Sequence, residues 1–247
     1  DYGMTPSSLI LDTAYISSMN PEEDEEVWRP KNYEGEFTGQ TLLRNALINS
    51  KNVITIKILQ TIGVKRAIDY ARRMGIESEL SPDLSLALGS SSMSLKEITT
   101  AYSAFANSGY LTESYCIERI EDRNGLVLEE NQPIIREAIP EDTAFVMTDI
   151  LKAVVTEGTG WRAKELKRPV AGKTGTTNDL RDAWFIGYTP NLLAGVWVGY
   201  DDSRPMGKGE TGSRAASPIW VYFMSEALKD QPVEDFDAPE GVNFVKI

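Results

Sequence analysis

The chain has 247 residues, of which 41% are apolar and 25% charged, a composition that supports a packed core in one large domain or two small ones. Its 37 acidic and 25 basic residues give a net charge of −12, which argues against a nucleic-acid-binding role and against a polybasic lipid-binding surface. The sequence contains no histidine, so Ser-His-Asp and Cys-His catalysis and histidine zinc sites are excluded within this chain.

Cys116 is the only cysteine, so an intrachain disulfide is excluded, and its place in an apolar run predicts a small buried side chain. The sequence shows no signal peptide, and no run of residues approaches the roughly 20 apolar positions of a transmembrane helix. The chain begins at Asp1 rather than at a methionine, and we interpret it as a piece of a longer protein.

Residues 1–110 are expected to be mostly helical. The stretch 17–40 is rich in Pro, Gly and Asn and predicts a loop, in which the acidic run 21–26 is expected to be solvated. Apolar residues at helical spacing follow, with breaks at Gly63 and Gly75 and a serine cap before the last helix. The helices are predicted over 41–47, 53–61, 64–74 and 94–107.

Residues 111–230 are expected to carry the sheet, followed by a tail over 231–247. Strands over 115–121 and 126–130 flank Asp122-Arg123-Asn124-Gly125, in which Asn-Gly is a strong hairpin signal. A helix is predicted over 141–156, strands over 169–174, 183–188 and 193–200, and a last helix over 217–228. Short connections imply antiparallel pairing, so the predicted fold class is α+β, an antiparallel sheet of about five strands packed with helices.

The stretch 171–178, AGKTGTTN, lies at the end of an expected strand. Its glycines allow a ligand to approach the backbone, and the hydroxyls of Thr174 and Thr176 with the charge of Lys173 suit a carboxylate. An N–H at the strand edge suits an oxyanion. A phosphate-binding P-loop is disfavoured, because it needs a glycine where Lys167 stands and a helix directly afterwards. A surface turn without function is the alternative.

Lys-Thr-Gly is one of three motifs of penicillin-binding proteins and related β-lactamases, together with Ser-x-x-Lys and Ser-Asp-Asn. Ser50-Lys51-Asn52 fits Ser-x-Asn at the break between two predicted helices, where both side chains would project into a cleft. A plain helix break is the alternative. Ser18-Met19-Asn20 fits the pattern too but has no flanking helices to fix its position.

Nearly end to end, the chain resembles the C-terminal transpeptidase domain of class A, bifunctional penicillin-binding proteins. The segments that carry the resemblance, in family order, are Thr5-Pro6-Ser7-Ser8 with Asp12, Trp28-Arg29-Pro30-Lys31-Asn32-Tyr33, residues 41–52, Gly158-Thr159-Gly160, residues 172–177, residues 182–188 and Val196-Trp197-Val198-Gly199. The resemblance implies a β-lactamase-like and penicillin-binding-protein-like fold. It also implies a peptidoglycan D,D-transpeptidase at the outer face of a bacterial cytoplasmic membrane, without a cofactor or metal.

In that family a serine attacks the D-Ala-D-Ala carbonyl of a stem peptide, and β-lactams acylate the same serine. The resemblance implies that Ser50 relays a proton to the leaving nitrogen, that Asn52 binds the substrate backbone and that Lys173 supplies positive potential. Thr174 and Thr176 would hold the terminal carboxylate, and the Thr176 N–H would form half of the oxyanion hole. The implied substrate-binding segment is Thr174, Gly175, Thr176 and Thr177.

The 247 residues contain no Ser-x-x-Lys, and the resemblance places the nucleophile helix just before Asp1. The chain is therefore expected to be a fragment of an active enzyme that is not acylated on its own. A scaffold domain that has lost its nucleophile and a serine β-lactamase relative are the alternatives. Loss of a central helix would expose apolar surface, so self-association, a bound missing segment or marginal stability is expected.

Overall fold

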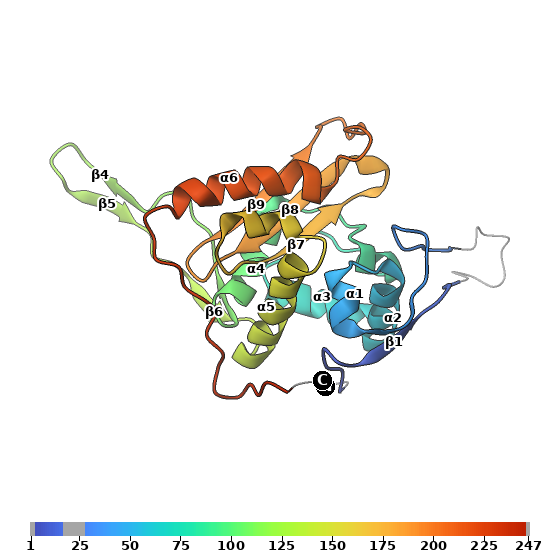
Figure 1. Cartoon of the computed structure of the whole chain (residues 1–247). Helices are drawn as coiled ribbons and strands as arrows, with labels where there is room; N and C mark the ends of the chain where they lie inside the picture. Colours follow the sequence, from blue (N-terminus) through green and yellow to red (C-terminus); the bar gives the residue numbers. More distant parts are fainter. Residues whose placement is uncertain (1–2, 17–27, 246–247) are drawn as a thin grey trace.

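The computed structural model describes residues 3–16 and 28–245, in which a three-stranded antiparallel sheet lies between layers of helices (Figure 1). The strand order is β7-β8-β9, with β7 over Ala171–Thr176, β8 over Asp182–Tyr188 and β9 over Leu193–Gly199. Lys173 pairs with Ile186, and Trp184 pairs with Trp197. Within the described residues β7 therefore forms one edge of this sheet, and it carries the Lys-Thr-Gly motif.

The side chains of β8 alternate between the two faces of the sheet, as a strand requires. Phe185 packs on Trp220 of α6 (Ser217–Ala227), with ring centroids 5.1 Å apart. Tyr188 points to the other face, where its hydroxyl lies 2.8 Å from Thr148 Oγ1 of α5 (Glu141–Thr156). The short 3₁₀ helix η2 (Trp161–Leu166) and α6 cover the first face, and α4 (Leu95–Ala106) and α5 cover the second.

The first turns of α4 and α5, the helices that cover the second face, are stabilised by their own side chains. Ser94 and Glu97 form a reciprocal capping box at the start of α4, which confirms the predicted serine cap. Glu141 and Asp142 lie in the first turn of α5, where negative charge is stabilised by the helix dipole. The structure gives α5 the predicted bounds, and it buries side chains on two sides because the helix packs against both β7 and α1.

A smaller group of helices lies beside the central sheet and the helices that cover it (Figure 1). It comprises α1 (Leu43–Ile48), α2 (Asn52–Ile62), α3 (Val64–Arg73) and the 3₁₀ helix η1 (Leu84–Leu88). Gly63 separates α2 from α3 with a φ of 85°, which a residue with a side chain rarely adopts. Two strands that the sequence did not suggest, β1 (Leu9–Asp12) and β2 (Gly39–Leu42), pair antiparallel beside these helices.

The predicted hairpin forms but stands apart from the central sheet. Its strands β4 (Arg119–Glu121) and β5 (Val127–Glu130) pair with each other and project from the body (Figure 1). At its base β3 (Tyr110–Thr112) pairs with β6 (Ile135–Glu137). The central sheet thus has three strands, not about five, because every residue of β4 and β5 is exposed and neither strand offers a buried face to the core.

Cys116 is exposed, not buried as predicted. It lies on the approach to the projecting hairpin, where its neighbours Tyr115 and Ile117 are also exposed, so the apolar run has no core to pack against. The predicted helix 41–47 is partly wrong too, since its first two residues pair in β2. Likewise Gly39 and Gln40 of the predicted loop belong to that strand. The acidic run 21–26 and Ser18-Met19-Asn20 lie outside the described residues.

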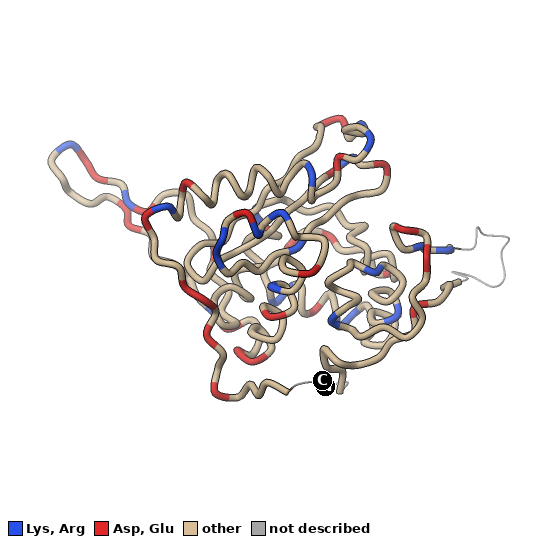
Figure 2. The backbone as a smooth tube through the Cα atoms, in the orientation of Figure 1, with Lys and Arg blue, Asp and Glu red and all other residues tan. Residues whose placement is uncertain are grey.

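The tail after α6 runs along the outside of α5 (Figure 1) and carries several of the acidic residues drawn in Figure 2. Lys152 of α5 forms an ion pair of 2.6 Å with Asp235. Arg168 donates hydrogen bonds to the carbonyl oxygens of Leu228, Gln231 and Pro232. Among the helices of residues 3–16 and 28–245, none is long and apolar enough to cross a membrane.

Candidate active site

Ser50 lies at the corner between α1 and α2, as the sequence predicts. Its N–H donates to Leu47 O and the N–H of Lys51 donates to Ala46 O, which is the hydrogen-bond pattern of a Schellman motif. Ser50 occupies the position where glycine is usual and has a φ of 53°. A side chain in this left-handed conformation costs about 1 kcal/mol, so the fold holds the Ser50 hydroxyl here against a local preference.

Lys173 of β7 meets this corner from the other side of the site. Its Nζ donates to Ser50 Oγ at 2.9 Å, joining residues 123 positions apart, and to the carbonyl oxygen of Thr174 at 2.9 Å. Lys173 lies on the same face of β7 as the buried Ala171, the face covered by α5. The structure therefore brings the Lys-Thr-Gly and Ser-x-Asn motifs into direct contact.

Burial lowers the pKa of Lys173 from 10.5 to about 8, because the charged ammonium is removed from water. At pH 7 about nine-tenths of the side chain is still protonated at such a pKa. The group is thus a cation in most molecules at neutral pH, and it loses its proton more readily than an exposed lysine does.

The other two residues of the Ser-x-Asn motif face the loop that precedes β2. Asn52 Nδ2 donates to the carbonyl oxygen of Lys31 at 2.9 Å, and Lys51 Nζ lies 3.3 Å from Glu34 Oε2. Lys51 is nearly buried. Its charge is therefore used within the fold, and Ser50 and Asn52 are left as the polar side chains of this corner.

The hydroxyls of the Lys-Thr-Gly strand have different surroundings. Thr174 Oγ1 donates to Thr159 Oγ1 at 3.0 Å, and Thr176 Oγ1 accepts the N–H of Gly212 at 3.0 Å. Thr177 is engaged with Asp182, whose N–H donates to Thr177 Oγ1 at 2.8 Å. Thr176 is exposed, so of these three hydroxyls it is the one most open to a ligand.

Gly175 allows close packing of the strand. A Cβ at this position would lie 3.1 Å from Trp184 Cβ on β8, tighter than ordinary packing allows. The Trp184 and Trp197 rings lie together with centroids 6.3 Å apart, and Trp197 Nε1 donates to Asp182 Oδ1 at 2.8 Å. These contacts join β8 to β9 beside Gly175, and the hydrogen bond between Asp182 and Thr177 ties the end of the motif strand to β8.

The loop after α5 completes the site with two residues to which the sequence assigned no role. A Cβ at Gly158 would collide with the carbonyl oxygen of Ile48, so glycine alone permits this loop to touch the end of α1. Thr159 donates its N–H to the same Ile48 oxygen at 3.3 Å and accepts from Thr174. The Gly-Thr-Gly segment was visible in the sequence, but its contacts with the end of α1 and with the Lys-Thr-Gly motif depend on the tertiary fold.

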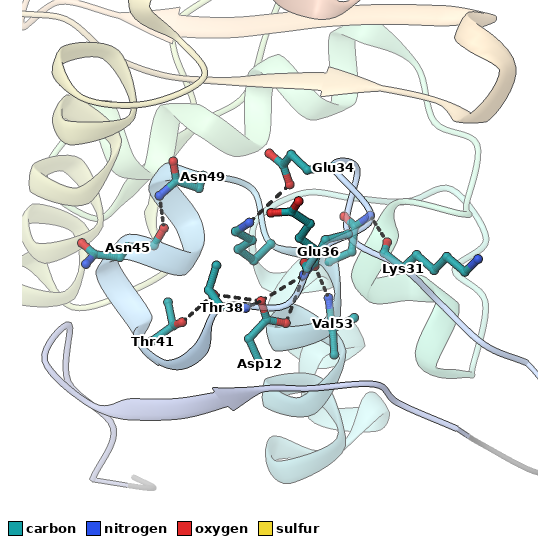
Figure 3. A network of polar contacts seen from close by, with 12 residues as sticks. Asp12, Lys31, Glu34, Glu36, Thr38, Thr41, Asn45, Asn49 and Val53 are labelled. Atoms are coloured by element: carbon teal, nitrogen blue, oxygen red, sulfur yellow. Dashed lines mark hydrogen bonds and ion pairs between the residues drawn. The ribbon is translucent and has the colours of Figure 1, made fainter.

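Three further residues near the corner were missed as well. The buried Asp12 and Asn32 and the exposed Thr38 form a hydrogen-bonded cluster in which Asn32 Oδ1 accepts the N–H of Val53 in α2 (Figure 3). Asp12 and Asn32 stood within segments of the family resemblance, but no local pattern indicated their contact, because 20 residues separate them.

In the described residues, neither the two cavities nor the acidic side chains form a second candidate active site. Two cavities of about 330 and 310 Å³ are not lined by Ser50, Lys173 or Thr174, although the smaller one borders the corner at Asn49 and Lys51. In the described part of the chain, no group of three or more Cys, Asp or Glu residues could hold a metal ion. The arrangement offers a cation, a hydroxyl in contact with it and an edge strand, which together suit binding and proton transfer at an acyl group.

Comparison with known proteins adds independent information. Residues 12–220 match the family model of the penicillin binding protein transpeptidase domain. The chain is 42% identical over 237 residues to penicillin-binding protein 1A of Aquifex aeolicus, covering 96% of this chain and 32% of that protein. It is 41% identical over 247 residues to penicillin-binding protein 1A of Neisseria gonorrhoeae, covering 97% and 31%.

Solved structures agree with the sequence comparison. The crystal structure of penicillin-binding protein 1A from Haemophilus influenzae superposes with a TM-score of 0.90 at 31% identity, covering 97% of this chain and 41% of that one. PonA1 from Mycobacterium tuberculosis superposes with a TM-score of 0.81 at 24% identity, covering 99% and 70%, a likeness that concerns the fold alone.

The chain spans about a third of the length of the curated relatives that it matches. The family match covers most of the chain, it includes both motifs that meet at Lys173 and Ser50, and the α+β fold is that of the solved transpeptidase domains. The predicted resemblance and the α+β fold class are thereby confirmed, apart from the number of strands in the central sheet, and the chain belongs to the transpeptidase domain family of penicillin-binding proteins.

Proposed function

We propose that this chain is part of a peptidoglycan D,D-transpeptidase that cross-links stem peptides through an acyl-serine intermediate. The observation that carries the proposal is the 2.9 Å hydrogen bond from Lys173 Nζ to Ser50 Oγ. It joins two of the three motifs of this enzyme class across the interface between a helix corner and an edge strand. Family membership supports the same reaction.

Ser50 and Lys173 are proposed to work as a pair. A hydroxyl that accepts a hydrogen bond from an ammonium is free to donate its own proton. Ser50 would give that proton to the leaving nitrogen and regain one from Lys173. The pKa of about 8 favours this exchange near neutral pH, since the lysine is charged yet able to release a proton.

Substrate would lie along the outer edge of β7. An edge strand offers unpaired N–H and C=O groups to an extended peptide. Thr174 and Thr176 are proposed to hold the terminal carboxylate, and the N–H of Thr176 to stabilise the oxyanion, next to Gly175. Thr177 is proposed to anchor the end of this segment, because its hydroxyl and its N–H are bonded to Asp182 and its carbonyl oxygen accepts the N–H of Leu180.

Asn52 is proposed to bind the substrate backbone. Its amide nitrogen donates to Lys31 O, which fixes the plane of the amide group and so directs the amide oxygen. An oxygen held in this way can accept the N–H of an extended peptide without further ordering of the side chain.

The nucleophile is proposed to come from chain outside these 247 residues, which contain no Ser-x-x-Lys. In this proposal residues 1–110, 111–230 and 231–247 are the helical part, the sheet part and the tail of one partial transpeptidase domain. The whole protein would be anchored in the membrane and act at its outer face. β-Lactams would acylate the completed site, and the isolated chain would bind the missing segment or self-associate.

Labelling with a fluorescent penicillin tests the proposal. The longer protein that includes a Ser-x-x-Lys segment should become covalently labelled, whereas the chain 1–247 alone should not. Lys173→Met in the longer protein should slow labelling by about 10²–10³, as loss of one electrostatic group in such a site typically does. An unlabelled longer protein of normal fold would refute the enzyme and leave the scaffold alternative.

A further inference from the structure

Asp12 is a carboxylate with no measurable solvent exposure, at the end of β1. Its oxygens accept hydrogen bonds from Asn32 Nδ2 at 3.1 and 3.0 Å, from the Thr38 N–H at 3.0 Å and from Thr38 Oγ1 at 2.9 Å (Figure 3). Burying a carboxylate is costly unless hydrogen bonds satisfy its oxygens. The cluster meets this need without a directly bonded cation.

Asp12 is ionised at neutral pH despite its burial. Removal from water raises the pKa of Asp12. The hydrogen bonds from Thr38 and Asn32 and the charge of Lys51 together lower it by more, so the pKa lies below its usual value of 3.8. An ionised carboxylate only accepts hydrogen bonds. It therefore fixes the orientation of the Asn32 amide, whose nitrogen must point toward it.

Asn32 passes this orientation to α2. With its nitrogen directed to Asp12 and to the carbonyl oxygen of Glu36, its Oδ1 accepts the N–H of Val53 at 3.2 Å. Val53 is the second residue of α2, where a helix N–H has no acceptor within the helix. A side chain 21 positions away thus supplies the cap that α2 lacks locally.

The same loop holds the rest of the Ser-x-Asn corner. Lys31 O accepts from Asn52, and Glu34 pairs with Lys51, so residues 51, 52 and 53 are all bonded to residues 31–34 (Figure 3). Ser50 directly precedes them in its left-handed conformation. Its N–H donates to Leu47 O and its hydroxyl accepts from Lys173, while the position of the chain that follows depends on where residues 51–53 are held.

We propose that Asp12 and Asn32 are positioning residues that, through Val53 and the 31–34 loop, set the place of Ser50 and Asn52 against Lys173. The proposal rests on the proposed function for its consequence in catalysis, but not for its structural part. If Asp12 and Asn32 only stabilised the fold, their loss would affect the corner no more than any other region. Local and general effects can be measured separately.

The first measurement is amide hydrogen exchange in the longer protein that includes a Ser-x-x-Lys segment. Asp12→Asn keeps the shape of the side chain but replaces one accepting oxygen by an NH₂ group. This group faces the donors of Asn32 or Thr38, so the Asn32 amide loses its fixed orientation. The Val53 N–H should exchange at least tenfold faster relative to Phe185 in β8, which reports on the central sheet. The double variant Asp12→Asn/Asn32→Asp restores a donor facing an acceptor between the two positions but leaves the Glu36 carbonyl oxygen without its donor, so it should recover part of the protection.

The second measurement is the second-order rate of acylation by a fluorescent penicillin in the longer protein. Asp12→Asn should lower it at least tenfold, with partial recovery in the double variant. Ser94→Ala removes the α4 cap and serves as the control for lost stability, with acylation unchanged. If Asp12→Asn does not fold, Thr38→Val removes one donor to Asp12 and should show smaller changes in the same directions.

Two results would overturn the positioning role. One is an equal acceleration of exchange at Val53 and Phe185 in Asp12→Asn. The other is an equal rate of acylation by penicillin for the Asp12→Asn and Ser94→Ala variants. Failure of the unsubstituted longer protein to react with penicillin would instead overturn the proposed function. In that case exchange at Val53 would still decide whether Asp12 and Asn32 hold the corner.

Discussion

The two sides of the candidate site are held by different kinds of interaction. β7 is fixed by a continuous backbone ladder with β8 that runs from Ala171 to Thr176. The corner at Ser50 has two backbone hydrogen bonds to the end of α1, and side-chain interactions join residues 51–53 to Glu34, Lys31 and Asn32. One side is therefore held by backbone groups that every residue possesses, whereas the other depends in addition on a few specific side chains.

This difference predicts an asymmetric response to substitution. A ladder survives most side-chain changes, because its N–H and C=O groups remain. A side-chain network fails when one member is lost, because buried donors are left without acceptors. Substitutions near the corner should therefore cost more stability than substitutions on β7, except at Lys173, whose burial carries a cost of its own.

Removal of the Asp12 carboxylate should have the largest effect. Asp12→Ala takes the main acceptor from the buried Asn32 amide and also releases the donors of the exposed Thr38, and we expect the free energy of unfolding to fall by about 3 kcal/mol. Urea denaturation measures this loss. A loss no larger than that of Thr177→Ala, on the β7 side, would contradict the asymmetry.

Lys173 should make the stability depend on pH. Because its pKa is about 8 when folded and 10.5 otherwise, the unfolded chain binds more protons between these values, and stability rises with pH across that window. Lys173→Met should remove about 2 to 3 kcal/mol of this rise. Urea denaturation at pH 7.5 and pH 10 tests it, with Lys208→Met at an exposed lysine as the control; an unchanged rise would contradict the burial of the charge.

Ser50 should show the cost of its conformation. Ser50→Ala and Ser50→Gly both lose the acceptor of the Lys173 hydrogen bond, but only glycine adopts a φ of 53° freely. We expect Ser50→Gly to be about 1 kcal/mol more stable than Ser50→Ala by thermal or urea unfolding. Equal stabilities would indicate that the corner is not strained.

The smallest effect on stability is expected at Thr176. Its exposed hydroxyl accepts only the Gly212 N–H in the described structure, so Thr176→Ala should change the free energy of unfolding by no more than about 0.5 kcal/mol. Penicillin acylation of the longer protein should nevertheless fall about tenfold or more if Thr176 binds the carboxylate. Thr177→Ala is the matched control, with a larger loss of stability and a smaller loss of acylation.

Long elements with clear periodicity were predictable from sequence, and short pairs were not. The bounds of α5 and the presence of β7, β8, β9 and the Asn-Gly hairpin are confirmed. The pairs β1-β2 and β3-β6 were missed, because strands of three or four residues carry too little alternation to detect. Placing the hairpin in the central sheet was wrong because its strands bury neither face.

For the site, the sequence indicated which residues meet but not how each one is engaged. Ser50 and Lys173 were expected in one cleft, and the structure joins them by a hydrogen bond. The engagement of Thr177 with Asp182 and the contact of Thr159 with Thr174 were not expected. Such contacts depend on the relative placement of distant elements, which no local pattern reports.

The sequence by itself determined the chemical repertoire, since a chain without histidine and with one cysteine leaves lysine, carboxyl and hydroxyl groups for acid–base work. It also determined the main helices and strands, through hydrophobic periodicity and the glycines that end them. Only the tertiary structure decided the lowered pKa of Lys173, the exposure of Cys116 and the burial of Asp12 beside Asn32. Burial and long-range hydrogen bonds arise when distant segments pack, and neither is a property of a residue and its neighbours in sequence.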